Sequence, residues 1–534
     1  MDCNTGKRST RAIPLVDHLQ TVQRPTDIKI SHFEALNIHV LEGASAEDIV
    51  PWAGYLPSKE GWDSIPQEQL SHADEVTRVP MSNGSISPGL QVYRERQKEL
   101  LVDNTSAFRT VRRIPPLAGE SAARLGNSYE FFKNLELCSG YWPDTSLPSQ
   151  KQGNHESSGD MSEEVSDGDA PSSNIPRHLQ THIAIGNGAQ LPPDHRTQLL
   201  HSFTKLVAYP FGCNVTFART EPRLHLTPSS SSSLSSSASS NPHSGSTTPR
   251  AKQKHRPSSH FNSSATFIYR TPTDRASARN GIVEGPLAVL SSRASHTFTL
   301  PSDHNLDFAR EVVAILLTAQ QRSRQHKTER RFGEDAWWTT SPRWGGGVGG
   351  PIGREAEARA EAEKAIEEGI ASGKGLASAV NQEAKRLIGG INSGQIQRSS
   401  SPSPSKRSKT ALTKEGNFQM YESYRNLKSP SASWDPKCRY EAIGKASGET
   451  YDDIFLISCL NHHVSVVRAR VPDKLVEVLE GADEEAGWGK LEICRTKWFD
   501  LYLGTERIEA LNVIWGVVNW LMRKEGSEKE GELE

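Results

Sequence analysis

The stretch DIFLISCLNHHVSVVRARV, from Asp453 to Val471, decides the fold class. Two apolar runs flank a short polar corner at Asn461–His463, and this pattern predicts an antiparallel β-hairpin. The residues that follow predict a helix at Asp473–Leu479, capped by Asp473, a strand at Leu491–Thr496 and a helix at Glu506–Met522. The order strand, strand, helix, strand, helix favours an α+β fold with a mostly antiparallel sheet and packed helices.

Further strands are expected before the hairpin. Strand-like patterns of apolar residues lie at Cys213–Arg219, Ala265–Arg270, Gly285–Arg293 and His296–Leu300, and THIAIG at Thr181–Gly186 predicts one more. A serine-rich tract with almost no side chain to bury separates the first two of these strands. We therefore expect one sheet with a long solvated insertion between its strands.

Helical spacing of apolar residues marks three segments in the first two thirds of the chain. Val92–Val102 predicts a short helix, and residues 192–209 predict a helix capped by Asp194. A third helix, capped by Asp303 or Asn305, is expected to bury one face.

Tracts that cannot form a core divide the chain. In order, we expect a poorly defined N-terminal region (1–150), an acidic disordered linker (151–174), the first part of an α+β body (175–344) with a serine-rich disordered insert (227–264), a Gly-rich turn with polar helices (345–398), a disordered Ser/Pro/Lys insert (399–433), the second part of the body (434–523) and a disordered tail (524–534). The two parts of the body are expected to share one interior.

Composition narrows the class of protein. Hydrophobic residues make up 35% of the 534 residues, and Lys+Arg 62 against Asp+Glu 64 give a net charge of -2, so no global field directs the chain to nucleic acid or an anionic membrane. The six cysteines form no CxxC pair, which is typical of reduced thiols. The N-terminus lacks the apolar core of a signal peptide, and no apolar run reaches the roughly 20 residues of a membrane span. We expect a cytoplasmic or nuclear protein without membrane association.

Three partial motifs do not predict a function. The glycines of Gly345–Gly350 match G-x-G-x-x-G, but no buried strand precedes them. His178 and His182 have the spacing of a helical metal pair, yet the segment favours a strand and no third ligand is near, so surface histidines are expected. His462 and His463 beside Cys459 suggest a thiol nucleophile with its base, but the hairpin favours a small core residue at Cys459. No catalytic residue, metal site or cofactor is therefore predicted.

Arginines near the central strands form the first candidate site. Guanidinium groups chelate phosphate or carboxylate in pairs, so a cluster of them predicts a site for a small anionic ligand. The candidate anion-binding residues are Arg270, Arg275, Arg279 and Arg293. The alternative is a solvated loop in which Asp274 and Glu284 pair with them locally.

A basic run forms the second candidate site. Cations followed by tryptophans and glycines are typical of surfaces that bind single-stranded nucleic acid through phosphate contacts and base stacking. The candidate residues are Arg322, Arg324, Lys327, Arg330 and Arg331. The alternative is that these cations interact with a helix dipole and that the tryptophans pack in the interior.

The stretch SPSPSKRSK, Ser401–Lys409, is typical of a proline-directed kinase site beside a basic cluster. We expect phosphorylation at Ser401 or Ser403, which would cancel charge that an import receptor or another acidic partner recognises. A chance match within a Ser/Pro-rich tract is the alternative.

Taken together, these features favour an interaction or regulatory protein without identifiable catalytic machinery, whose disordered arms bind an unknown protein partner. Two alternatives are an enzyme or sensor that binds a small anionic ligand through the arginine cluster, and a nucleic-acid-binding protein.

Overall fold

The computed structural model describes residues 13–58, 61–116, 119, 121–147, 181–216, 222–229, 259–271, 282–293, 298–325, 328–329, 438–484 and 487–524. The chain divides into two compact units, the larger made of 1–273, 284–324 and 441–534 and the smaller of 274–283 and 325–440. In the smaller unit, β7 (Thr328–Glu329) pairs antiparallel with β8 (Cys438–Glu441). Except for the first two residues of β6, the elements below belong to the larger unit.

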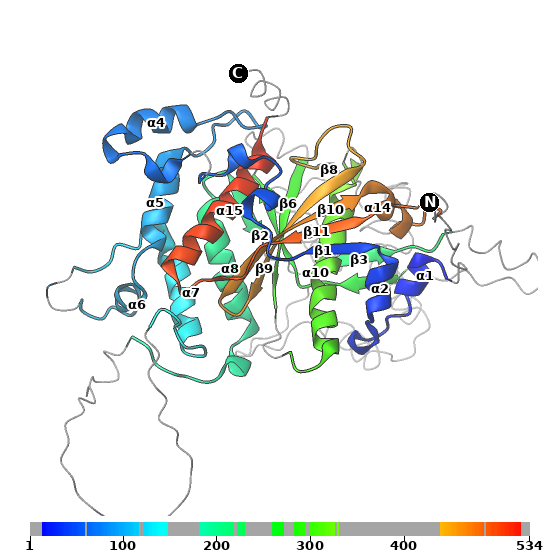
Figure 1. Ribbon diagram of the computed structural model, residues 1–534, viewed down its shortest axis with the longest axis horizontal. Helices are drawn as coiled ribbons and strands as arrows, with labels where there is room; N and C mark the ends of the chain where they lie inside the picture. Colours follow the sequence, from blue (N-terminus) through cyan, green and yellow to red (C-terminus); the bar gives the residue numbers. More distant parts are fainter. Residues whose placement is uncertain are drawn as a thin grey trace, which may run out of the picture. The chain divides into compact units, whose positions relative to one another are not determined.

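A mixed β-sheet forms the centre of the larger unit (Figure 1). Its strands run in the order β1-β11-β10-β9-β6-β5-β2, and β12 also pairs with β10. The strands are β1 Ile38–Leu41, β2 Cys213–Thr216, β5 Thr266–Arg270, β6 Ile282–Ser292, β9 Tyr451–Leu460, β10 His463–Pro472, β11 Leu491–Arg495 and β12 Phe499–Asp500. The pairs β1/β11 and β6/β9 are parallel, and the other neighbours in this order are antiparallel. The predicted α+β class with a mostly antiparallel sheet is confirmed.

The predicted hairpin is formed by β9 and β10. His463 lies opposite Leu460 in their antiparallel register, and Asn461 reverses the chain with a φ of 56°. The strands predicted on either side of the serine-rich tract correspond to β2 and β5, which pair with each other. Because β6 pairs in parallel with β9, strands from before and after the middle of the chain belong to one sheet.

Helices pack on both faces of this sheet. The α-helices are α1 Leu15–Leu19, α2 Ile30–Ala35, α3 Ala46–Ile49, α4 Leu70–Thr77, α5 Leu90–Leu100, α6 Asn104–Arg112, α7 Tyr129–Ser139, α8 Pro193–Ala208, α10 Pro301–Arg322, α14 Asp473–Leu479 and α15 Gly504–Met522. Short 3-10 helices are η1 Pro25–Asp27, η2 Ala53–Tyr55, η3 Trp62–Ser64, η4 Gln67–Gln69, η5 Gly126–Ser128 and η7 Gly188–Gln190. The helices predicted from apolar spacing correspond to α5, α8, α10, α14 and α15.

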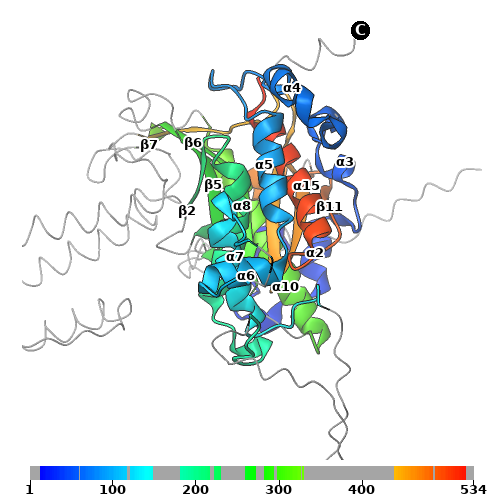
Figure 2. The same cartoon turned by 90° about the vertical axis from the view of Figure 1, so that its left-hand side faces the viewer.

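Side chains of β9 alternate between the two faces of the sheet. Phe455, Ile457 and Cys459 belong to a buried cluster with residues of α5, α7, α8 and α15. On the other face, the Ser458 hydroxyl donates to Oε1 of Glu311 on α10, at 2.7 Å. Figure 2 shows the side of the unit on which α5, α6, α7 and α8 lie. Burial on both faces explains why β9 and β10 are almost continuously apolar.

Helix α15 is buried on more than the single face that the sequence predicted. Its Trp515 is fully buried, with ring centroids at 5.2 Å from Tyr93 and 5.1 Å from Phe211. The helix contacts α8, α3, η2 and α5. The N-terminal region, in which sequence periodicity was weak, therefore supplies a second surface against which α15 packs.

A small second sheet pairs β3 (Arg223–Leu226) with β4 (Ser259–Asn262). The side chain of Gln320 on α10 bonds the backbone N–H and C=O of His225 in β3, at 3.1 and 2.8 Å. Strand β4 lies inside 227–264, the tract predicted to be disordered. The predicted tract therefore extends too far at its C-terminal end. Pairing with β3 satisfies the backbone hydrogen-bonding groups of β4, which we expected to be bonded to water.

Two predicted strands are absent from the described residues. Thr181–Gly186 is not a strand, because the N–H groups of Ile185 and Gly186 donate to the carbonyl of Gly140 rather than to a neighbouring strand. The other predicted strand is His296–Leu300. Its described residues, 298–300, lead into α10. The carboxylate of Asp303 accepts from Leu300 N at 3.0 Å, so α10 begins at Pro301, earlier than predicted.

Two predicted N-caps lie one or two positions too late. The N-cap residues of α8 and α14 are Pro192 and Pro472, and Asp194 and Asp473 fall in the first turn. A carboxylate there still interacts favourably with the helix dipole, which is why the sequence signal was present. In the described part of the chain, no helix combines the length and the apolar character needed to cross a bilayer.

Candidate functional site

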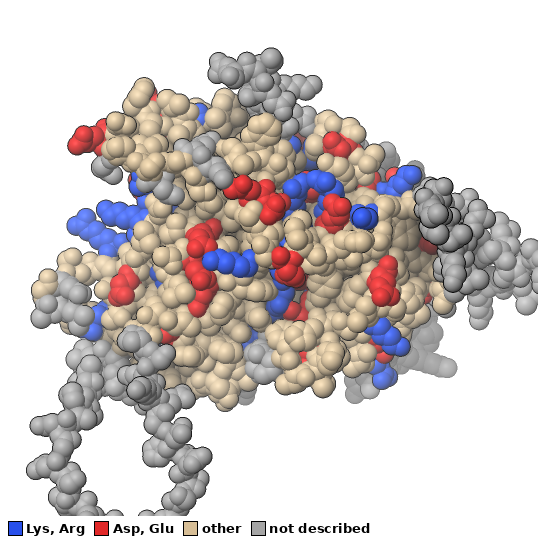
Figure 3. Space-filling model, viewed as in Figure 1, with Lys and Arg blue, Asp and Glu red and all other residues tan. Residues whose placement is uncertain are grey.

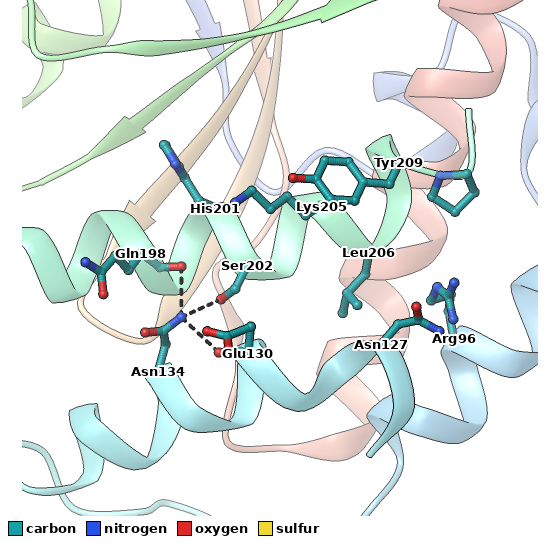
Figure 4. A pocket seen from close by; sticks show the side chains of 11 residues that line it. Arg96, Asn127, Glu130, Asn134, Gln198, His201, Ser202, Lys205, Leu206 and Tyr209 are labelled. Carbon is teal, nitrogen blue, oxygen red and sulfur yellow. Dashed lines mark hydrogen bonds between the residues drawn. The ribbon is translucent and has the colours of Figure 1, made fainter. Parts of the chain in front are cut away.

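A pocket of about 620 Å³ opens between α5, α7 and α8 (Figure 4). Its lining is mostly polar and comes from three parts of the chain that are distant in sequence. The residues are Arg96, Asn127, Glu130, Asn134, Gln198, His201, Ser202, Lys205, Leu206, Tyr209 and Pro210. Its volume falls within the range of small-molecule sites, of about 300–1,000 Å³.

One buried amide fixes the wall between α7 and α8. Nδ2 of Asn134 donates to the carbonyls of Glu130 and Gln198 at 2.9 and 3.3 Å, and contacts Oγ of Ser202 at 3.1 Å. Figure 4 shows these three bonds meeting at the Asn134 side chain. Because the amide bridges the two helices, it sets the spacing of this wall of the pocket.

Two cations line the pocket. Nζ of Lys205 lies 5.9 Å from the centre of the Tyr209 ring and forms no ion pair with any residue that the structure describes. Arg96 is 9% exposed, and its Nη1 donates to Glu99 Oε2 at 3.0 Å. Within the described ranges, Nε of Arg96 has no hydrogen-bond partner. An anion in the pocket would meet the charge of Lys205, which has no carboxylate partner among the described residues.

His201 adds a neutral imidazole to the pocket. Its Nε2 lies 2.7 Å from Oγ1 of Thr266 on β5, and the residue is 1% exposed. Burial lowers the pKa of His201 to about 4. The ring is therefore uncharged at neutral pH and adds no positive charge to the pocket.

The predicted arginine cluster is not assembled by the residues that are described. Arg270 lies opposite Glu284 and forms a buried ion pair with it, and Arg293 lies beyond the other end of β6. Arg293 pairs with Asp307 and with Glu311, the latter at 2.5 Å. Arg275 and Arg279 lie outside the described residues. Both described guanidinium groups are therefore already paired with buried carboxylates.

The described residues of the predicted nucleic-acid site are also buried. Arg322 is 1% exposed and pairs with Asp452 on β9, and Arg324 is 2% exposed. Lys327, Arg330 and Arg331 lie outside the described residues, as do Ser401 and Ser403 and the glycines of Gly345–Gly350. A guanidinium enclosed in this way is not on a surface that a phosphate backbone can reach.

Cys459 is the core residue that the hairpin predicted. It is fully buried, its thiol lies 3.3 Å from the carbonyl of Asn461, and burial raises its pKa to about 12. A thiol with this pKa does not supply a nucleophilic thiolate at neutral pH. His182 is half-buried, and its Nε2 lies 3.1 Å from Asp144 Oδ2, while His178 lies outside the described residues.

Sequence reasoning missed the pocket because no motif contains its residues. Arg96, Asn127 and Lys205 come from α5, η5 and α8, and only the packing of these helices brings them together. Comparisons of the chain with protein-family models, with curated proteins and with solved structures find no significant match.

Proposed function

We propose that this chain is a regulatory protein that binds a small anionic ligand, carrying phosphate or carboxylate groups, in the pocket between α5, α7 and α8. The proposal rests on Lys205, which lines a pocket of about 620 Å³ and has no carboxylate partner in the described part of the chain. A cation left unpaired beside amide and hydroxyl groups binds an anion through charge-assisted hydrogen bonds.

The surroundings of Lys205 support a ligand with a planar portion as well as a charge. Tyr209 is 53% exposed and lies at the pocket beside Lys205, so its ring face is accessible for stacking. Asn127 of η5 offers an amide group on another wall, and Gln198 adds one from α8. A regulatory output through the polar inserts at 227–264 and 399–433 is part of the same proposal and rests on their sequence alone.

Nucleic-acid binding is less well supported. On the face drawn in Figure 3, Lys and Arg side chains alternate with Asp and Glu side chains, and the described residues there form no extended basic stripe. Phosphate-backbone binding depends on several cations acting together, so a mixed surface of this kind favours a discrete ligand over a nucleic acid.

Thermal unfolding of the full chain with a panel of anions tests the proposal. The probes are inorganic phosphate, pyrophosphate, citrate and adenosine monophosphate. A probe present at about 100 times its dissociation constant adds about 2.7 kcal/mol to the free energy of unfolding. We expect at least one probe to raise the melting temperature, and Lys205→Met to remove that shift without altering the unliganded protein.

Lys98→Met is the matched control, because Lys98 is exposed on α5 and does not line the pocket. It should keep the full ligand-induced shift. A panel without any stabilising anion, or a shift that is equal in wild type and Lys205→Met, would contradict the proposal.

A further inference from the structure

The tip of the β9–β10 hairpin brings two histidines and a carboxylate together. His462 follows Asn461 in the turn, and His463 begins β10. In the antiparallel pairing of β10 with β12, His463 lies opposite Asp500. One ring nitrogen of each histidine and a carboxylate oxygen of Asp500 all lie within 4.8 Å of one another.

The distances between these groups do not correspond to hydrogen bonds. Nε2 of His462 is 3.7 Å from Oδ1 of Asp500, and Nε2 of His463 is 3.9 Å from Oδ2. Hydrogen bonds between such atoms are about 2.7–3.2 Å long. Two donors at about 2.0–2.1 Å from one tetrahedral zinc ion lie about 3.3 Å apart, so small side-chain rotations would bring the three groups to coordination distance.

The surroundings of His462 independently indicate a bound cation. The residue is 5% exposed, and neither of its ring nitrogens has a hydrogen-bond partner among the described residues. Its ring packs against Tyr502 at 4.6 Å and His463 at 4.2 Å between centroids. Buried polar groups normally have a partner, and a cation would supply one here.

The carboxylate is already held in place. Oδ2 of Asp500 accepts a hydrogen bond from Thr145 Oγ1 at 2.5 Å, and Oδ1 accepts from the backbone N–H of Tyr502 at 2.9 Å. Hydrogen bonds to a ligating carboxylate of this kind orient it and are typical of metal sites. The backbone N–H of Asp500 donates to Glu506 at 2.6 Å, which brings a second negative charge close to the group.

We propose that His462, His463 and Asp500 bind a divalent transition-metal ion, such as Zn²⁺. Two imidazoles and one carboxylate suit such an ion, and three protein ligands leave a coordination position for water or another small ligand. The side chain of His463 is 35% exposed, so one of the three ligands borders solvent. The proposal is independent of the pocket beside Lys205.

Metal titration of the full chain tests this proposal. Protein freed of metal by a chelator is titrated with Zn²⁺ in a calorimeter, and bound metal is counted by mass spectrometry after dialysis. We expect one tight Zn²⁺ per chain, with affinity reduced at least tenfold in His463→Asn and in Asp500→Asn. His463 is partly exposed and Asn is close in shape, so the metal-free melting temperature of His463→Asn should match that of wild type.

His18→Asn is the matched control, because the His18 ring also stacks on another histidine, His32, at 4.5 Å between centroids. In the described part of the chain that pair has no carboxylate that completes a three-ligand group. The His18→Asn protein should therefore bind Zn²⁺ with the stoichiometry and affinity of wild type. The proposal is overturned if wild type binds no Zn²⁺, or if His463→Asn and Asp500→Asn keep the wild-type stoichiometry and affinity.

Discussion

The guanidinium of Arg322 on α10 and the carboxylate of Asp452 on β9 form a buried bidentate ion pair, with Nε to Oδ2 at 2.7 Å and Nη2 to Oδ1 at 3.0 Å. Nη1 of Arg322 also donates to the carbonyls of Pro286 and Ile443, at 2.8 and 2.9 Å. Arg322 thus links α10 to β6. It also links α10 to β9, although Arg322 and Asp452 lie 130 positions apart in the sequence.

Replacing this arginine should destabilise the fold. Arg322→Met leaves the Asp452 carboxylate buried without its partner, and such a change costs about 3–5 kcal/mol. Urea denaturation followed by circular dichroism measures the loss. Adding Asp452→Asn to Arg322→Met should restore part of the stability, because it removes the unpaired charge.

The control for this ion pair is Lys497→Ala, which breaks a pair with Glu509 in which both side chains are about half exposed. Pairs of that kind are worth less than about 1 kcal/mol. Equal losses in Arg322→Met and Lys497→Ala would show that burial of the Arg322 pair has no energetic consequence.

Gly516→Ala should destabilise α15 although alanine is the better helix former by about 1 kcal/mol. A Cβ at Gly516 would lie 2.6 Å from Cδ2 of Leu56 and 3.0 Å from Cγ2 of Val50, in the contact with the N-terminal region. Overpacking of a core costs about 1–3 kcal/mol, so we expect a lower melting temperature. Gly504→Ala is the comparison, since its Cβ would meet only Leu101 at 3.7 Å. A stabilised Gly516→Ala protein would contradict the packing described here.

His201 should make stability fall in mild acid. The pKa of His201 is lowered from 6.5 to about 4 in the folded protein, so the unfolded chain binds this proton more tightly. The free energy of unfolding should therefore decrease as the pH drops from about 6.5 towards 4, by up to roughly 3 kcal/mol from this group. Chemical denaturation at a series of pH values should give a shallower decrease in His201→Gln. Parallel curves for the two proteins would exclude this contribution.

Three cysteines should resist labelling in the native protein. Cys138, Cys213 and Cys459 are buried, and burial raises the pKa of each to about 12. Cys494 is only partly buried, although its pKa is also raised. Maleimide labelling followed by peptide mass spectrometry should modify Cys494 faster than the other three, and all four should react in urea. Rapid native labelling of Cys459 would contradict its position in the core.

Local sequence patterns predicted most helices and strands correctly. They failed where a contact with a distant segment determines the conformation. The Asp453–Val471 hairpin and α8 follow from apolar periodicity and turn residues, which depend only on neighbours along the chain. Thr181–Gly186 has a strand-like pattern, but its backbone bonds the end of α7. Similarly, the arginines near β5 and β6 suggested an exposed anion site, and buried carboxylates pair with the two that are described.

The sequence by itself determined the α+β class, the hairpin and the spacing of its two histidines, because short-range sterics and alternating hydrophobicity specify these features. Only the tertiary structure decided that Asp500 lies opposite His463 and that Lys205 and Arg96 line one pocket. Both arrangements depend on strand pairing or helix packing between segments far apart in the chain. The periodicity within a segment sets which face is buried but does not identify the segment that covers it.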